Sequence, residues 1–172
     1  MAFIDTAYVP ILTDRIKASG SELVIFHNAY LIGGFIGSFY CLFSKKSSAF
    51  NLNVSNILLI AVFLLAITVN SYMAFFAVGI LRSVATLISR ISSRTLCQEE
   101  AKGKYSGRVM SFRMISIDLA GVIFYGLGIY WYRNYSVESM MLFSAGVLVI
   151  AFFLTGLGVK RKNGEMSEQS VV

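Results

Sequence analysis

The chain has 172 residues, of which 56% are hydrophobic and 14% are charged, and its mean hydropathy is +0.70. An ordinary soluble domain carries about 25% charged residues, so this composition excludes a soluble enzyme, a disordered tail and a disulfide-rich secreted module. The net charge of +6 comes from basic residues that separate apolar runs, so nucleic acid is not an expected partner. The expected fold class is an all-α integral membrane protein, with the lipid bilayer as its main surroundings.

The apolar runs predict five transmembrane helices. Residues 1–21 mix apolar and polar residues and contain Pro10, and their apolar stretch is too short to span a membrane. They show no pattern of a signal peptide. The predicted spans are 22–43, 54–70, 73–94, 110–132 and 138–159, each near the length of about 20 residues that a bilayer requires. Residues 160–172 form a polar tail, so 22–159 is expected to be one transmembrane domain without an extramembrane catalytic part.

The loop charges predict an outer N-terminal segment and a cytoplasmic tail. Lys and Arg concentrate in cytoplasmic loops of membrane proteins. Three basic residues lie on one side, namely Arg15, Lys17 and Arg133; eight lie on the other, namely Lys45, Lys46, Lys102, Lys104, Arg108, Lys160, Arg161 and Lys162. Trp131 with its neighbouring tyrosines is then expected to form an aromatic belt at the outer interface.

The third span carries an unusual row of polar residues. Arg82, Thr86, Arg90 and Arg94 recur every four residues, which predicts one stripe along a helix. A charge at the bilayer centre costs about 3 kcal/mol or more, so Arg82 is expected to face protein or a watery cavity. Two interpretations stay open for Arg82: a cationic wall of a path for anions, or a structural arrangement in which Arg82 is paired and Arg90 and Arg94 reach the cytoplasmic surface. For Arg94 the structural interpretation is favoured.

Asp118 in the fourth span is the candidate partner of these arginines. Counted from opposite ends of neighbouring helices, Arg82, Arg90 and Asp118 are expected at overlapping depths. Asp118 is interpreted either as a titratable proton site coupled to transport or as half of a fixed ion pair, and the second interpretation is slightly favoured.

His27, the single histidine, is three residues before Tyr30 and shares its helix face. A proton relay or ligand contact is weighed against a satisfied polar group between helices, which is favoured. One histidine without a carboxylate cluster predicts no metal site, and no cofactor or catalytic motif is recognised, so the chain is not expected to be an enzyme. The glycines at 33, 34 and 37, and those at 121, 126 and 128, predict close helix packing.

The segment LCQEEAKGKYSGRVMSFRMISIDLAGVIFYGLGIY resembles the region before and through the eleventh helix of major facilitator superfamily exporters. The matching positions are Gln98, Gly107, Arg108, Val109 and Ser111. The first residues, AYVPILTDRIKASGSELVIFHNAYLIGGFIGS, resemble the end of the seventh helix and the glycine-rich eighth. A Pro usual between the Gln and GRV is missing, and Ala101 lies in that region.

The resemblance implies that the five spans correspond to helices eight to twelve of such a bundle, in the drug and siderophore efflux branch that includes enterobactin-type exporters. It implies a location in the bacterial inner membrane. The superfamily binds substrate between two halves, so a second membrane polypeptide or self-association is expected to complete a working unit.

Three functional hypotheses follow. The first is a partial efflux transporter for a small organic anion such as a siderophore or drug, with Arg82, Arg90, Asp118 and His27 as candidate substrate-binding residues. The second is an accessory or immunity component of an export system, which uses the same helices as a docking surface. The third is a transporter remnant without activity.

Overall fold

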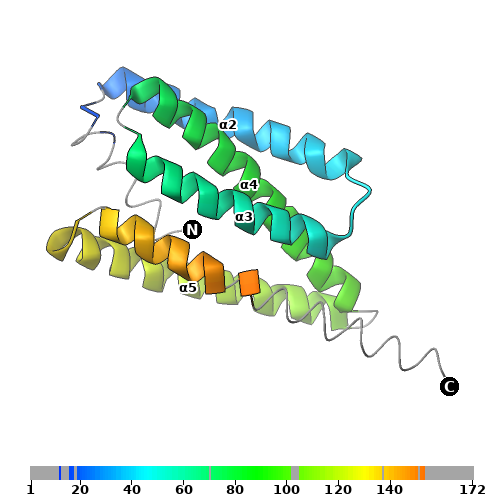
Figure 1. Ribbon diagram of the computed structural model, residues 1–172. Coiled ribbons are helices and arrows are strands. Elements are labelled where there is room, and N and C mark those ends of the chain that lie inside the picture. The colour runs from blue at the N-terminus through cyan, green and yellow to red at the C-terminus, as the bar shows by residue number, and fades with distance from the viewer. Residues whose placement is uncertain are drawn as a thin grey trace.

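A computed structural model shows a bundle of helices (Figure 1). It describes residues 12, 16–17, 19–69, 71–101, 105–136, 138–150 and 152–153. Within these residues the secondary structure is helical, without strands, as the sequence predicts. The long helices are α2 (Gly20–Phe43), α3 (Ser48–Thr68), α4 (Tyr72–Glu100) and α5 (Ser106–Asn134), and a shorter apolar helix covers Glu138–Ile150.

Four of these helices, α2 to α5, are long and apolar enough to cross a membrane. The predicted fifth span, 138–159, is described as a helix only over its first part, and its remainder lies outside the described residues. Most of the predicted outer segment 1–21 and all of the predicted tail 160–172 also lie outside them.

Local sequence signals explain where the helices begin. Ser19 and Glu22 form a capping box at the start of α2, in which the Ser19 backbone N–H donates to Glu22 Oε2 at 2.6 Å. The Ser47 hydroxyl accepts from the Phe50 backbone N–H at 3.3 Å. Because of this cap, α3 begins six residues earlier than the predicted start of the second span at Val54.

Helix α4 is the central element, because it packs extensively against α2 and α3 and meets α5 over a small area. Glycines bring α2 close to α4. A Cβ added at Gly33 would collide with the Ile80 backbone oxygen, and one at Gly37 would lie 2.9 Å from the Val84 backbone oxygen. The Ser83 hydroxyl donates to the Tyr30 backbone oxygen at 2.6 Å across the same contact. The predicted packing at Gly33 and Gly37 is confirmed.

Hydrogen bonds also join three helices at the end where α2 connects to α3. The hydroxyls of Tyr40 and Ser44 donate to Asn51 Oδ1 at 3.3 and 3.2 Å. The Ser48 hydroxyl donates to Glu99 Oε1 at 3.0 Å and so links α3 to α4. Ser48 and Asn51 at this end of α3 therefore belong to the helix and are hydrogen-bonded to neighbouring elements.

The apolar core lies where α2, α3, α4 and the helix Glu138–Ile150 meet. Its central members are Phe26, Phe63, Phe75, Met140 and Met141, which are buried almost completely. The helix Glu138–Ile150 runs alongside α5 and contributes both methionines (Figure 1). It thereby couples α5 to the rest of the bundle, which α5 itself contacts little.

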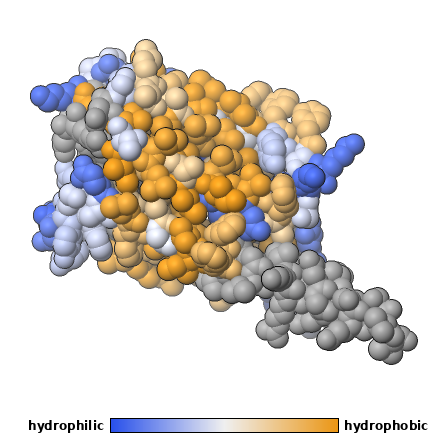
Figure 2. All heavy atoms as spheres, viewed as in Figure 1, coloured by the Kyte–Doolittle hydropathy of each residue, from blue (hydrophilic) through white to orange (hydrophobic). Residues whose placement is uncertain are grey.

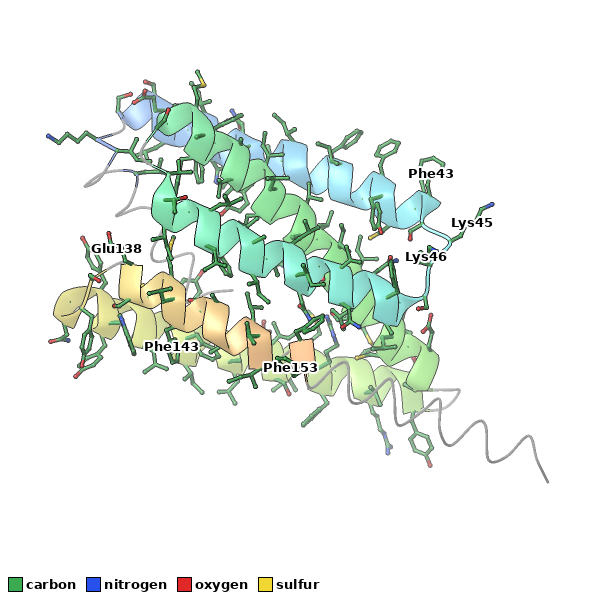
Figure 3. All side chains as sticks on the ribbon, in the orientation of Figure 1. Phe43, Lys45, Lys46, Glu138, Phe143 and Phe153 are labelled. Atoms are coloured by element: carbon green, nitrogen blue, oxygen red, sulfur yellow. The ribbon has the colours of Figure 1, made fainter. Side chains whose placement is uncertain are left out.

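The surface has the pattern of a membrane protein. Figure 2 shows a broad apolar band between two hydrophilic ends. Lys45 and Lys46 lie at one end of the bundle and Glu138 at the other (Figure 3). Only 6% of the residues in the apolar window of α5 are buried, against 39% in α3 and in α4. Helix α5 is therefore the least covered of the long helices.

Candidate functional site

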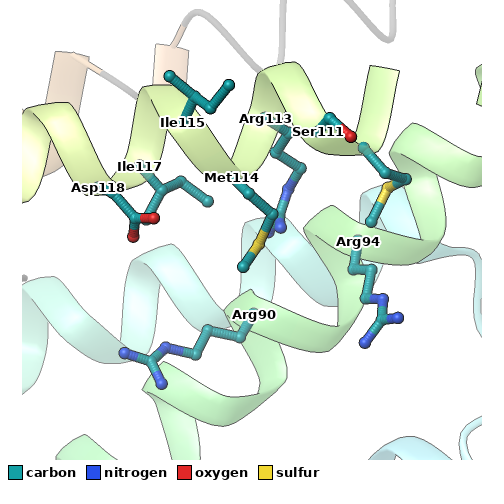
Figure 4. Close-up of a pocket in the computed structure, with 9 residues that line it drawn as sticks. Arg90, Arg94, Ser111, Arg113, Met114, Ile115, Ile117 and Asp118 are labelled. Atoms are coloured by element: carbon teal, nitrogen blue, oxygen red, sulfur yellow. The ribbon is translucent and has the colours of Figure 1, made fainter. Parts of the chain in front are cut away.

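A half-open groove of about 840 Å³ lies between α4 and α5. Helix α4 contributes Arg90 and Arg94, and Figure 4 shows their side chains together with those of α5. The lining residues from α5 are Met110, Ser111, Arg113, Met114, Ile115, Ile117 and Asp118. An adjoining pocket of about 680 Å³ shares Arg90, Arg113, Ile117 and Asp118 with it and continues along α5 to Phe124 and Tyr125.

Two charged residues of the groove, Arg90 and Asp118, lie close to the middle of long helices. Asp118 is two residues from Ala120 at the midpoint of α5, and Arg90 is four residues from Thr86 at the midpoint of α4. At about 1.5 Å per residue these offsets are about 3 and 6 Å. Both are toward the end where α4 connects to α5, so the two charges lie at similar depth, as the sequence predicts.

Arg90 and Asp118 are both exposed to the groove. In Figure 4 the Asp118 carboxylate points from α5 toward α4, and the Arg90 side chain extends along α4 toward the same part of the groove. Arg90 and Asp118 therefore line the same groove, and their pairing stays a prediction.

Arg113 is a groove residue that the sequence-based reasoning missed. Its Nη2 donates a hydrogen bond to Ser93 Oγ at 2.7 Å, which links α5 to α4. The sequence did contain a signal for Arg113, because it is a second charged residue, besides Asp118, inside the predicted span 110–132 and lies three residues from the beginning of that span. Such a charge in an apolar segment is a candidate for function by the same argument that selected Asp118.

Arg82 lies elsewhere. It is 3% exposed, and its guanidinium carbon is 5.1 Å from the centroid of the Tyr30 ring of α2, in a cation–π arrangement. Arg82 does not belong to the lining of the groove that Asp118 enters.

The predicted single stripe of arginines is therefore divided between two surfaces, and helix geometry explains why. Four residues turn an α-helix by about 400°, so each step of four drifts by about 40° around the axis. Arg90 is thus rotated by about 80° from Arg82. Arg82 packs against α2, whereas Arg90 and Arg94 are exposed on the side that meets α5.

His27 is exposed on α2, with its ring centroid 6.4 Å from that of Tyr30. It therefore lies near the Arg82–Tyr30 contact and outside the lining of the groove. Among the described residues no group of three His, Cys, Asp or Glu side chains could hold a metal ion. Cys41 and Cys97 are free thiols.

The groove has the chemistry of an anion-binding site. Its described lining contains three guanidinium groups and one carboxylate, and its remaining surface is mainly apolar. Guanidinium groups form strong, charge-assisted hydrogen bonds with carboxylates and phosphates. Methionine and isoleucine side chains beside them can contact the apolar body of an organic ligand.

Comparisons of the chain with protein-family models, with curated proteins and with solved structures give no match.

Proposed function

We propose that this chain is a membrane transport protein of the efflux type, which moves a small organic anion outward through the groove between α4 and α5. The resemblance to the carboxy-terminal half of major facilitator superfamily exporters supports the same class, with a siderophore or a drug as the substrate. The location that fits is the inner membrane of a bacterium, with Lys45 and Lys46 on the cytoplasmic side.

The observation that carries the proposal is the position of Arg90 and Asp118. Both are exposed charges inside predicted spans of helices that are long and apolar enough to cross a membrane: Asp118 lies near the middle of its span and Arg90 lies four residues from the end of its own. A charge at the centre of a bilayer costs about 3 kcal/mol or more when it faces lipid. A water-filled path or a bound ion removes this cost, and a transporter provides both.

The residues of the groove suggest how an anion is handled. Arg90 and Arg113 attract the anionic group from opposite helices, while Met114 and Ile117 contact its apolar part. Asp118 repels the anion when it is ionised and so opposes binding.

The exposed side of α5 supports a partner as part of the proposed unit. Little of its apolar window is buried, and Asp118 lies within the poorly covered region. A second membrane polypeptide or a second copy of the chain is the proposed cover, because rocking of two halves around one site is the usual transport movement of such bundles.

Extrusion of a fluorescent organic anion tests the proposal. Bacterial cells that express the chain are loaded with carboxyfluorescein, and its loss from the cells is recorded. Arg90→Gln should slow extrusion about tenfold, because a hydrogen bond to a charged group contributes about 1.5–3 kcal/mol. Arg133→Gln, which removes the same charge at the other end of α5, is the control and should extrude normally.

Two control measurements show whether extrusion is specific for anions and whether each variant is present in the membrane. Cells should extrude the cation rhodamine 123 at the same rate with or without the chain. Equal extrusion of carboxyfluorescein by the chain, by Arg90→Gln and by cells that lack the chain would contradict the proposed function. The amount of each variant in the membrane is measured in parallel, so that a loss of protein is not read as a loss of transport.

A further inference from the structure

The charges of the groove do not cancel. Arg90, Arg94 and Arg113 are opposed by Asp118 alone among the described lining residues, which leaves a charge of +2. This excess of positive charge attracts an anion to the groove. The ligand that neutralises this site completely carries two negative charges.

The arginines also define two separate positions for those charges. In Figure 4 the Arg90 guanidinium lies toward the Asp118 end of the groove, whereas Arg94 lies at the Ser111 end, with Met114 between them. Arg94 follows Arg90 by one helical turn, and their side chains extend in different directions. Two anionic groups on one molecule can therefore be bound apart from each other.

Arg113 lines both the groove and the adjoining pocket together with Arg90. Its hydrogen bond to Ser93 fixes the guanidinium between α4 and α5. A guanidinium has five N–H donors, so this bond leaves donors for an anionic group that Arg90 also contacts. Fixing the side chain before binding lowers the entropy lost when the ligand arrives.

We propose that the groove binds an amphiphilic organic dianion. One anionic group binds between Arg90 and Arg113, the second binds Arg94, and an apolar body contacts Met114 and Ile117. The inference rests on the proposed function and deepens it, because it names the class of anion that is carried.

Calorimetric titration of the purified full chain tests the charge requirement. The probes are 1,4-phenylenedipropionate, its monoamide and its diamide, which share one apolar body and carry two, one and no negative charges. The dianion should bind about tenfold more tightly than the monoamide, a difference of about 1.4 kcal/mol. The monoamide should in turn bind more tightly than the diamide.

Variants identify the residues responsible. Arg94→Gln should remove the preference for the dianion and leave binding of the monoamide unchanged, since only the second anionic group contacts Arg94. Asp118→Asn should tighten binding of both anions, a gain that damage to the fold would not produce. Arg108→Gln, outside the described lining, is the matched control and should keep the preference for the dianion.

The outcomes separate this inference from the proposed function. Equal binding of dianion and monoamide, with the diamide weaker, would overturn the dianion proposal and leave an anion transporter standing. Equal binding of all three probes, or weaker binding of anions by Asp118→Asn, would show that the groove does not select anions. Each of these last two results, equal binding of all three probes or weaker binding by Asp118→Asn, would overturn the dianion proposal and the anion path together.

Discussion

At the scale of single residues, Gly33 sets how closely α2 approaches α4. The space beside its α-carbon is filled by the Ile80 backbone and the Ser83 side chain. Helices in a membrane associate through close packing at such small residues, because the hydrophobic effect does not drive association between helices that are surrounded by lipid. The predicted close packing is wrong for Gly121 and Gly126 of α5, since a Cβ at either position would meet nothing within 4 Å among the atoms of the structure.

This contrast predicts opposite effects for one substitution. Gly33→Ala should destabilise the bundle by about 1–3 kcal/mol, the usual cost of inserting a methyl group into a packed contact. Gly126→Ala should cause no loss, because its methyl group enters open space. Thermal unfolding of the purified variants in detergent measures both, and equal midpoints would show that the α2–α4 contact tolerates separation.

At the scale of elements, α5 has two different exposed sides. Met114 lies on the side that lines the groove, together with Ser111 and Asp118. Leu119 is exposed as well but does not belong to the groove lining. We expect the side of α5 that carries Met114 to face water and the side that carries Leu119 to face lipid.

Thiol labelling distinguishes these two sides. In a chain whose Cys41 and Cys97 are replaced by alanine, Met114→Cys should react readily with a small hydrophilic methanethiosulfonate, whereas Leu119→Cys should react slowly. Labelling in intact membranes, followed by mass spectrometry, measures the two rates. The result that the account does not allow is faster labelling at position 119 than at 114.

At the scale of the whole molecule, the positions of the helices could be predicted from the sequence, because runs of about 20 apolar residues have few alternatives. The boundaries were less accurate where polar residues continue a helix, as Asn51 does at the start of α3. The depth of Arg90 and Asp118 followed from counting residues along the helices.

The rotation of each helix could not be predicted in the same way. Whether an arginine meets α2 or α5 depends on packing between segments that are distant in sequence, and a drift of about 40° every four residues separates Arg82 from Arg90. The contact between Arg113 and Ser93 could not be predicted for the same reason, because it depends on how α5 is rotated against α4. The approach of Gly33 and Gly37 to α4 followed from their spacing alone.

The central claim is that organic anions pass through the groove between α4 and α5. Its most direct test is the extrusion of carboxyfluorescein by Met114→Cys and Leu119→Cys chains before and after treatment with a bulky methanethiosulfonate. The account predicts that modification at position 114 lowers extrusion to the rate of cells that lack the chain, while the Leu119→Cys chain keeps its rate after the same treatment. Undiminished extrusion after complete modification at position 114 would contradict it.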